Sequence, residues 1–304
     1  MASQSNGMLD CLIIGGGPAG LTAAVYLARY RRSVVVYDDG KSRAKLIPES
    51  HNYPGFSGIH GADLLKTLRH QARRYGAHIE HAHIEGLRKE GDGNFTATAA
   101  GRDIRAQRVI MATGIVDESP HVPGLREAIY HGALRYCPIC DGYEAMDQKI
   151  GVLGTLDTAC HKSLFLRTYS RNVVVLAADR ISPVEEGIAE QLERAGIVIS
   201  EDVVDDIERD GEKIVARLAN GARIELDVLY PALGCEVRSK LGLALGANAN
   251  DVGCLVVDDH QRTSVPGLYA AGDVVSDLHQ ISVGTGHAAI AATAVHNSLP
   301  RNFR

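Results

Sequence analysis

Residues 10–38, DCLIIGGGPAGLTAAVYLARYRRSVVVYD, decide the fold of this chain. A short apolar strand is followed at once by a glycine-rich turn at residues 15–20, then by an apolar helix and a second strand that ends at Asp38. Strand, glycine turn, helix, strand and acid in this order are typical of a dinucleotide-binding βαβ unit. We therefore expect an α/β protein with a doubly wound parallel sheet.

Each glycine of the turn has a physical role in such a unit. Gly15 permits the tight turn, Gly17 lets the backbone approach a pyrophosphate, and Gly20 lets the helix pack on the strand. The start of the helix then offers amide groups and a positive dipole to the phosphates. At the end of the second strand Asp38, with Asp39 as the alternative, would accept hydrogen bonds from ribose hydroxyls.

The same architecture recurs further along the chain. A strand is predicted at 149–153, a helix at 158–169 and another strand at 172–177. The apolar segment LYPALG at 229–234 then takes the place that VIMATG at 109–114 has in the first copy. Two copies of one architecture indicate an internal duplication.

The second copy is predicted to be inserted into the first. The strand and the Ala-rich helix within 255–299 need a sheet to join, which insertion of the second copy into the first domain would provide. We therefore predict two three-layer Rossmann-like domains, the first made of residues 1–118 and 243–304 and the second of residues 119–242. Within the first domain, the alternating segments of 78–109 are predicted to be antiparallel strands.

Composition and charge exclude several functions. The chain has 304 residues, of which 45% are hydrophobic and 23% charged, as in a globular protein with two domains or one large one. A net charge of −5 provides no general attraction to nucleic acid or anionic membranes. The apolar runs are too short to cross a bilayer, and the first seven residues, MASQSNG, lack a signal pattern. We therefore expect a soluble, cytoplasmic protein.

The cysteines point to redox chemistry. Cys137 and Cys140 form a CxxC pair, followed by Asp141, which could move a proton between a thiol and a leaving thiolate. A structural zinc site would need a second Cys or His pair at ligand spacing, and none follows, so no metal site is predicted. The other cysteines are expected to be small buried hydrophobic residues: Cys11, Cys160, Cys235 and Cys254.

Five motifs together resemble a known family. GGGPAG (15–20), NYPGF (52–56), ATG (112–114), CPICDG (137–142) and GLYAAGDV (267–274) have the order and spacing found in low-molecular-weight thioredoxin reductases. The resemblance covers essentially the whole chain. It implies a discontinuous FAD domain, interrupted by a smaller nicotinamide-type domain that carries the CxxC pair, in a homodimer.

The resemblance also assigns roles by position. Cys140 matches the cysteine that faces the flavin, Cys137 the cysteine that exchanges with the substrate, and Asp141 the acid–base group. Asn52 would lie near the flavin, and Asp273 would bind the ribityl chain. The full set that the resemblance assigns to FAD is Gly15, Gly17, Pro18, Ala19, Gly20, Asp38, Asn52, Thr113, Gly114, Gly272, Asp273, Gln280 and Ile281.

The second copy departs from the family at the nucleotide site. Where the reductases carry GGGDSA, residues 154–159 read GTLDTA, and Leu156 is expected to project into the space that a pyrophosphate needs. The basic segment that would hold the 2′-phosphate of NADPH is replaced by Ala177-Ala178-Asp179-Arg180. The sequence therefore predicts that this domain keeps its fold and has lost efficient NADPH binding.

These features favour a dithiol oxidase, which would close a disulfide in a small-molecule dithiol and pass the electrons through FAD to oxygen. One alternative is a disulfide reductase that acts on a thioredoxin-like protein and is supplied by NADPH or ferredoxin. Another is a non-enzymatic flavoprotein redox sensor. With no nicotinamide to accommodate, the CxxC pair is expected to stay in one arrangement, with Cys140 near the flavin.

Two histidines near the C-terminus could take part in this chemistry. His279 replaces an Arg of the reductases, next to the retained Gln280. His287 is a candidate base for a substrate thiol, since the pKa of histidine is ordinarily near 6.5. The alternative for His287 is a side chain packed among alanines or facing a dimer partner.

Overall fold

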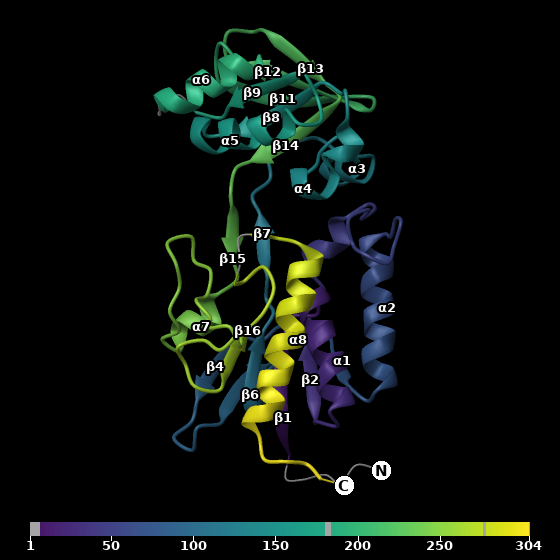
Figure 1. Cartoon of the computed structure of the whole chain (residues 1–304), viewed down its shortest axis with the longest axis vertical. Coiled ribbons are helices and arrows are strands. Elements are labelled where there is room, and N and C mark those ends of the chain that lie inside the picture. The colour runs from purple at the N-terminus through teal and green to yellow at the C-terminus, as the bar shows by residue number, and fades with distance from the viewer. Residues whose placement is uncertain (1–6, 180–183, 276–277, 304) are drawn as a thin grey trace.

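The computed structural model describes residues 7–179, 184–275 and 278–303. The described chain forms two units that are joined by a pair of strands (Figure 1). Arg180, the basic residue of the altered NADPH segment, lies outside the described residues.

The first unit is built on one sheet with the order β3-β2-β1-β6-β5-β4, and β16 pairs with the end of β6. The central strand β1 is parallel to both β2 and β6, and its residues 11–14 are buried because they lie in the middle of the sheet. The strands are β1 (Met8–Ile14), β2 (Val34–Tyr37), β3 (His78–Glu80), β4 (Gly86–Lys89), β5 (Phe95–Ala99), β6 (Arg102–Met111) and β16 (Leu268–Ala270).

The predicted antiparallel strands of 78–109 are only partly correct. Strands β4, β5 and β6 do pair antiparallel. Strand β3, however, pairs parallel with β2. Helix α2 (Gly61–Arg74) lies between β2 and β3 in the chain and carries it back to the starting end of the sheet. Strand β3 can therefore run in the same direction as β2, as in a crossover connection.

Helices cover the first sheet. Helix α1 (Pro18–Arg29) follows the glycine turn and lies against α8 (Ile281–Ser298), the long C-terminal helix (Figure 1). The inner face of α8 carries buried small residues, which let the two helices approach closely. The remaining short elements of this unit are η1 (Arg43–Leu46) and α7 (Lys240–Ala244).

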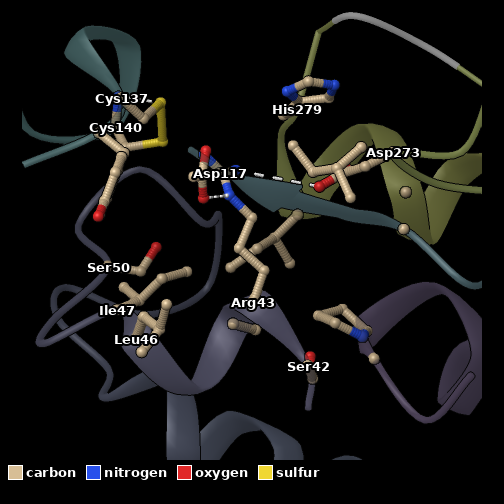
Figure 2. Close-up of a pocket in the computed structure, with 18 of the residues that line it drawn as sticks. Ser42, Arg43, Leu46, Ile47, Ser50, Asp117, Cys137, Cys140, Asp273 and His279 are labelled. Atoms are coloured by element: carbon tan, nitrogen blue, oxygen red, sulfur yellow. Dashed lines mark hydrogen bonds and ion pairs between the residues drawn. A yellow bond between two sulfur atoms is a disulfide. The ribbon is translucent and has the colours of Figure 1, made fainter. Parts of the chain in front are cut away.

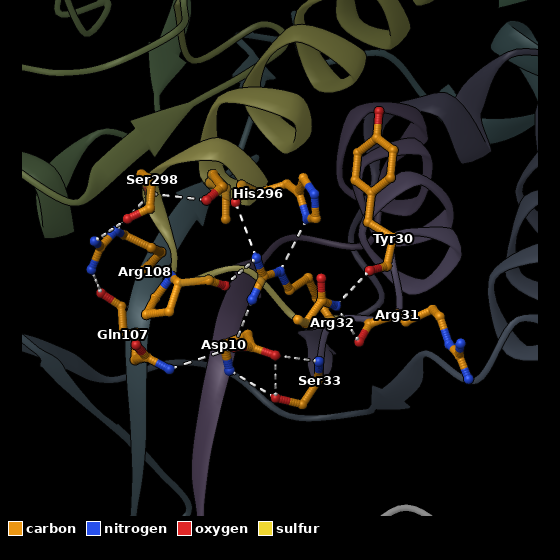
Figure 3. A network of polar contacts seen from close by, with 12 residues as sticks. Asp10, Tyr30, Arg31, Arg32, Ser33, Gln107, Arg108, His296 and Ser298 are labelled. Carbon is orange, nitrogen blue, oxygen red and sulfur yellow. Dashed lines mark hydrogen bonds and ion pairs between the residues drawn. The ribbon is translucent and has the colours of Figure 1, made fainter. Parts of the chain in front are cut away.

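A polar network ties the end of the chain to its beginning (Figure 3). Arg32, which is 8% exposed, donates hydrogen bonds to the Nδ1 and the backbone oxygen of His296 at 3.1 Å and to the oxygen of Pro300 at 2.9 Å. Its guanidinium lies 3.7 Å from Asp10, which in turn accepts the backbone N–H of Ser33 at 2.8 Å. The C-terminal helix therefore belongs to the N-terminal unit, as the predicted insertion requires.

The second unit repeats the architecture. Its parallel sheet has the order β10-β9-β8-β14, and an antiparallel sheet β11-β12-β13 lies beside it. The strands are β8 (Ile150–Gly154), β9 (Val173–Ala177), β10 (Val198–Ile199), β11 (Val204–Asp210), β12 (Lys213–Leu218), β13 (Arg223–Leu226) and β14 (Val228–Ala232). The helices are α3 (Leu125–Tyr130), α4 (Pro138–Asp141), η2 (Tyr143–Ala145), α5 (Leu156–Leu166) and α6 (Glu186–Ala195).

The chain passes between the units along two paired strands. Strand β7 (Ile115–Asp117) leaves the first unit and pairs antiparallel with β15 (Cys235–Val237), which returns to it. The predicted fold of two Rossmann-like units, one inserted into the other, is confirmed. No helix in the described part of the chain combines the length and apolar character that a membrane crossing needs.

Candidate active site

The CxxC pair is a disulfide at the start of α4. The Cα atoms of Cys137 and Cys140 are 5.3 Å apart, the separation that one helical turn provides. Pro138 occupies the first helical position, where its missing N–H costs nothing. The N–H of Cys140 donates to the Sγ of Cys137 at 3.2 Å, a contact that favours a thiolate on Cys137 once the disulfide opens.

A cavity of about 350 Å³ runs from the glycine turn to this disulfide. It brings together segments that are far apart in the sequence, since both sulfur-bearing residues and the first glycines of the chain line it. Of the predicted cofactor residues it contains Gly15, Gly17, Pro18, Ala19, Asp38, Asn52, Thr113, Gly114, Gly272, Asp273, Gln280 and Ile281. The remaining one, Gly20, lies behind the turn.

The first glycine turn has the shape of a phosphate cradle. A Cβ on Gly15, whose φ is +111°, would collide with the carbonyl oxygen of Ala112, and one on Gly20 would collide with the carbonyl oxygen of Gly15. At Gly17 the nearest atom to such a Cβ is the Ser42 Oγ at 3.3 Å. Two glycines are therefore needed for close backbone packing, and the third leaves the backbone open toward the cavity.

Asp38 lies at the same end of the cavity, 5% exposed. Its carboxylate accepts hydrogen bonds from Arg69 Nη2 at 2.7 Å and from the N–H of Gly40 at 2.9 Å. A carboxylate has about four acceptor positions, so it keeps capacity for ribose hydroxyls after both contacts are made.

A second cavity, of about 230 Å³, opens on the other side of the disulfide. Cys137 lines both cavities, whereas Cys140 is found, among the described residues, only in the wall of the first. The two sulfurs therefore have different neighbours. Cys235 also lines the second cavity and is half-buried, so its prediction as a buried hydrophobic residue is wrong. It lies on β15, where the chain crosses between the units and little covers it.

Side chains of the first unit hold the disulfide in place. Asn52 Nδ2 donates to Gln280 Oε1 at 2.9 Å and to the backbone oxygen of Ile139, inside the CxxC pair, at 3.3 Å. Gln280 Nε2 lies 3.3 Å from the Sγ atoms of both Cys137 and Cys140. These contacts join three parts of the chain and keep Cys140 at the first cavity.

Asp141 is the titratable group nearest to the pair in sequence. Burial raises the pKa of its carboxyl to about 6, against an opposing effect of Arg135 and of the Tyr230 hydroxyl. That hydroxyl donates to Asp141 Oδ1 at 2.9 Å from the buried strand β14. A carboxyl with a pKa near neutrality can both accept and return a proton.

Sequence reasoning missed an ion pair in the wall shared by the two cavities. Arg43 extends from η1 toward Asp117, to which it donates two hydrogen bonds of 2.6 and 2.8 Å (Figure 2). The guanidinium also lies 3.9 Å from Asp273 Oδ2, and burial raises the pKa of that carboxyl. Arg43 and Asp117 are 74 positions apart, so no local pattern could have revealed the pair.

The two candidate histidines, His279 and His287, differ in their position relative to the cavities. His279 lines both cavities. His287 lies one helix turn and a half into α8; burial lowers its pKa while the nearby Asp273 opposes this, and its Nδ1 is buried without a hydrogen-bond partner. Among the described residues, the walls of the two cavities do not include His287. In the same described residues, no three His, Cys, Asp or Glu side chains are grouped as a metal site would need.

The second glycine turn is built differently. Helix α5 begins at Leu156, whose half-buried side chain packs against the core of the second unit. The hydroxyl of Thr158 donates to the carbonyl oxygen of Ala232 at 2.8 Å and bonds to the hydroxyl of Thr155. The side chain of Leu156 is therefore partly packed and partly exposed, and its projection into the phosphate space stays a prediction.

Comparison with known proteins identifies the family. The pattern of the pyridine nucleotide-disulphide oxidoreductases matches residues 9–295. The chain belongs to this family. It is 30% identical to a thioredoxin reductase of Listeria monocytogenes serovar 1/2a over 303 residues, which cover 96% of this chain and 93% of the relative. A thioredoxin reductase of Aquifex aeolicus is 29% identical, covering 98% and 96%.

Solved structures agree with this. The crystal structure of HlmI superposes with a TM-score of 0.89 at 30% identity, covering 98% of this chain and 94% of that one. A thioredoxin reductase from Streptococcus pyogenes MGAS5005 gives 0.88 at 27% identity, with 96% and 98% covered. This pyridine nucleotide-disulphide oxidoreductase is thus a thioredoxin reductase-like, flavin-dependent disulfide oxidoreductase, and its family implies that it binds FAD. The open cradle at Gly17, the acid Asp38 and a cavity that ends at a disulfide fit FAD.

Proposed function

We propose that this enzyme oxidises small dithiols to disulfides, with the electrons leaving through FAD to oxygen. The observation that carries the proposal is the second turn, where Leu156 begins the helix in place of the glycine that would admit a pyrophosphate, and where the hydroxyl of Thr158 bonds to a strand carbonyl. Efficient NADPH binding is not expected there. The substrate would then supply the electrons instead.

The first half of the reaction needs only the cysteines and the substrate. One substrate sulfur, as a thiolate, attacks Cys137 Sγ; the bond between Cys137 and Cys140 breaks, and Cys140 leaves as a thiolate. The second substrate sulfur then attacks the first, which closes the product disulfide and releases Cys137. The substrate loses two electrons and two protons: the cysteine pair gains the two electrons, one proton goes to solvent when the first thiol ionises, and the other goes to Asp141.

The surrounding residues support each transfer. Cys137 would be the sulfur attacked because it opens to the second cavity, and Cys140 would pass the electrons on because it lines the first. Gln280 Nε2 lies close enough to both sulfurs to stabilise a thiolate on either. Asp141 would take up and return a proton. When bound, the flavin supplies the acceptor for the two electrons and delivers them to oxygen.

The assignment of individual residues follows the same proposal. The cradle Gly15, Gly17, Pro18, Ala19, Gly20 and the acid Asp38 would hold the ADP part of FAD. Asn52, Thr113, Gly114, Gly272, Asp273, Gln280 and Ile281 would hold the remainder. The domain boundaries at 118 and 242, the homodimer, the cytoplasmic location and the role of His287 stay predictions.

The test is the flavin absorbance under anaerobic conditions. We expect a small dithiol to bleach it and the colour to return when air is admitted, whereas NADPH and NADH bleach it slowly or not at all. Rapid bleaching by NADPH would contradict the proposal.

A second function has its own support. The curated relatives are named thioredoxin reductases, so a reductase that acts on a thioredoxin-like protein remains the competing proposal. It predicts rapid bleaching by NADPH, or by reduced ferredoxin, followed by reduction of a thioredoxin disulfide. The third alternative, a non-enzymatic redox sensor, is disfavoured because the chain belongs to a family of enzymes.

A further inference from the structure

The cavity beside Cys137 contains a cation that the redox chemistry does not use. Lys162 reaches it from α5, and its Nζ donates to the carbonyl oxygens of Pro231 at 2.6 Å and Tyr136 at 3.3 Å. An ammonium has three donors, so one remains for a ligand. The two carbonyls fix the position of the ammonium at the cavity wall.

Among the described residues, Lys162 has no carboxylate in direct contact with its ammonium. Arg43 and Asp117 satisfy each other through two hydrogen bonds. Glu118 is exposed. Asp117 and Asp141 are near enough to oppose the lowering of the Lys162 pKa, but in the described part of the chain neither forms an ion pair with this ammonium. Burial lowers the pKa of Lys162 to about 8, which leaves most of the side chain charged at neutral pH. A half-buried cation in this state gains from an anionic ligand.

The size and the remaining walls of the cavity limit what can enter. Its volume of about 230 Å³ is below the range of roughly 300–1,000 Å³ of pockets for drug-sized molecules. A ligand of roughly a dozen non-hydrogen atoms would fit it. Ile139 and Leu278, which are 47% and 45% exposed, provide apolar surface for a carbon skeleton.

We propose that this second cavity binds the dithiol substrate and that Lys162 binds an anionic group of that substrate, a carboxylate or sulfonate, while one substrate sulfur reaches Cys137. The inference rests on the proposed dithiol oxidation and specifies its substrate class. The reaction step is unchanged: the substrate thiolate bonds to Cys137 Sγ, and Cys140 leaves as a thiolate. Lys162 is a substrate-binding residue that selects charge and sets the distance between the anion and the reacting sulfur.

Matched pairs of dithiols test the charge selection. The first pair is 2,3-dimercaptopropane-1-sulfonate and neutral 2,3-dimercaptopropan-1-ol; the longer pair is dihydrolipoate and neutral dihydrolipoamide. Each is mixed anaerobically with the FAD-loaded protein, and the opening of the Cys137–Cys140 disulfide is followed by alkylation and mass spectrometry. Each rate is divided by the rate of the same dithiol with a free aromatic disulfide, which removes differences in intrinsic thiol reactivity.

We expect the anionic member of at least one pair to react about 10-fold faster, the effect of roughly one charge-assisted hydrogen bond. In Lys162→Gln the ratio should fall to near one, whereas Lys162→Arg should keep a preference. The exposed Lys149 lies in the same unit, and Lys149→Gln is the matched control that should leave the ratio unchanged.

The outcomes separate the two proposals. If the wild-type disulfide opens with all four dithiols but no pair shows a charge preference, the role of Lys162 is wrong and the oxidation stands. The same conclusion follows if Lys162→Gln keeps the preference. If none of the four dithiols opens the disulfide, the proposed oxidation fails and the inference about Lys162 fails with it.

Discussion

In the first unit the chain leaves β1 through three glycines and enters α1 at Pro18, whereas in the second it leaves β8 through one glycine and enters α5 at Leu156. The first turn is open toward a cavity. In the second, a leucine packs into the core and threonine hydroxyls bond to each other and to a strand carbonyl. The same strand–turn–helix architecture is therefore present twice, with different surroundings at the helix start.

The difference teaches that this strand–turn–helix architecture tolerates different residues at the helix start. A glycine is needed at the end of β8 although the two residues after it are not glycines, because a Cβ on Gly154 would collide with the carbonyl oxygen of Ala232. That glycine lets β8 and β14 pack closely. The second unit presents the disulfide and Asp141 to the cavity that the first glycine turn lines.

The largest effect on activity is expected from a substitution in the disulfide, which the second unit carries. Cys140→Ser should reduce dithiol oxidation on the order of 1,000-fold or more, because the attacked bond no longer exists. Bound flavin should remain, since the cradle belongs to the first unit. Turnover by anaerobic and aerobic absorbance, with flavin content as the control, measures both. Cys160→Ala, a buried cysteine of the same unit, should retain activity.

The next effect concerns Asp141. Asp141→Asn should slow turnover about 100-fold, the size of a general acid–base contribution. The limb of the pH–rate profile near pH 6 should disappear with it, since the pKa of this carboxyl is raised to about 6. Asp157→Asn, an exposed carboxyl on α5, is the control and should leave the profile unchanged.

The free energy of unfolding gives an independent test of the raised pKa of Asp141. Burial raises the folded-state pKa of Asp141 from 3.8 to about 6, so the folded protein binds the extra proton between these values. Its favourable contribution is complete below about pH 4 and is lost as the pH rises through 6. Asp141→Asn should therefore be more stable than the wild type by about 2–3 kcal/mol at pH 8 in urea unfolding. Equal stabilities at pH 8 would contradict the raised pKa.

Gly20→Ala tests the open turn directly. The new Cβ would collide with the carbonyl oxygen of Gly15, so α1 must shift against β1. We expect FAD affinity to fall about 10- to 100-fold, the size of typical overpacking costs. Thr155→Ala, at the corresponding turn of the second unit, should leave FAD affinity unchanged. Equal losses in both variants, measured by flavin fluorescence on dilution, would remove the distinction between the turns.

The smallest effect is a gain of function at the second turn. Replacing Thr155 and Leu156 by glycine should tighten NADPH binding by at most about 10-fold, since the basic segment is still absent. The same variant should lose about 1–3 kcal/mol of unfolding free energy, because Leu156 leaves the core and glycine weakens the helix start. Titration calorimetry with NADPH measures the first and urea unfolding the second. Tight NADPH binding by the wild type would show that the altered turn does not prevent nucleotide binding.

Local patterns predicted much of the molecule. Apolar runs that end in glycine predicted the strands and turns of both units, and the spacing of Cys137 and Cys140 predicted a redox pair. The same patterns failed to predict the direction of one strand and the burial of one cysteine. They did not distinguish the parallel β3 from the antiparallel strands after it, and they predicted Cys235 as buried although it lines a cavity.

The sequence by itself determined the two βαβ units, the open first turn and the altered second one, because each depends on residues within one short stretch of chain. The tertiary structure decided what surrounds the disulfide. The pair of Arg43 and Asp117, the hydroxyl of Tyr230 on Asp141, and the ammonium of Lys162 beside Cys137 come from distant segments. Their charges and pKa values depend on burial and on partners across the two units, and no local pattern in the chain specifies either.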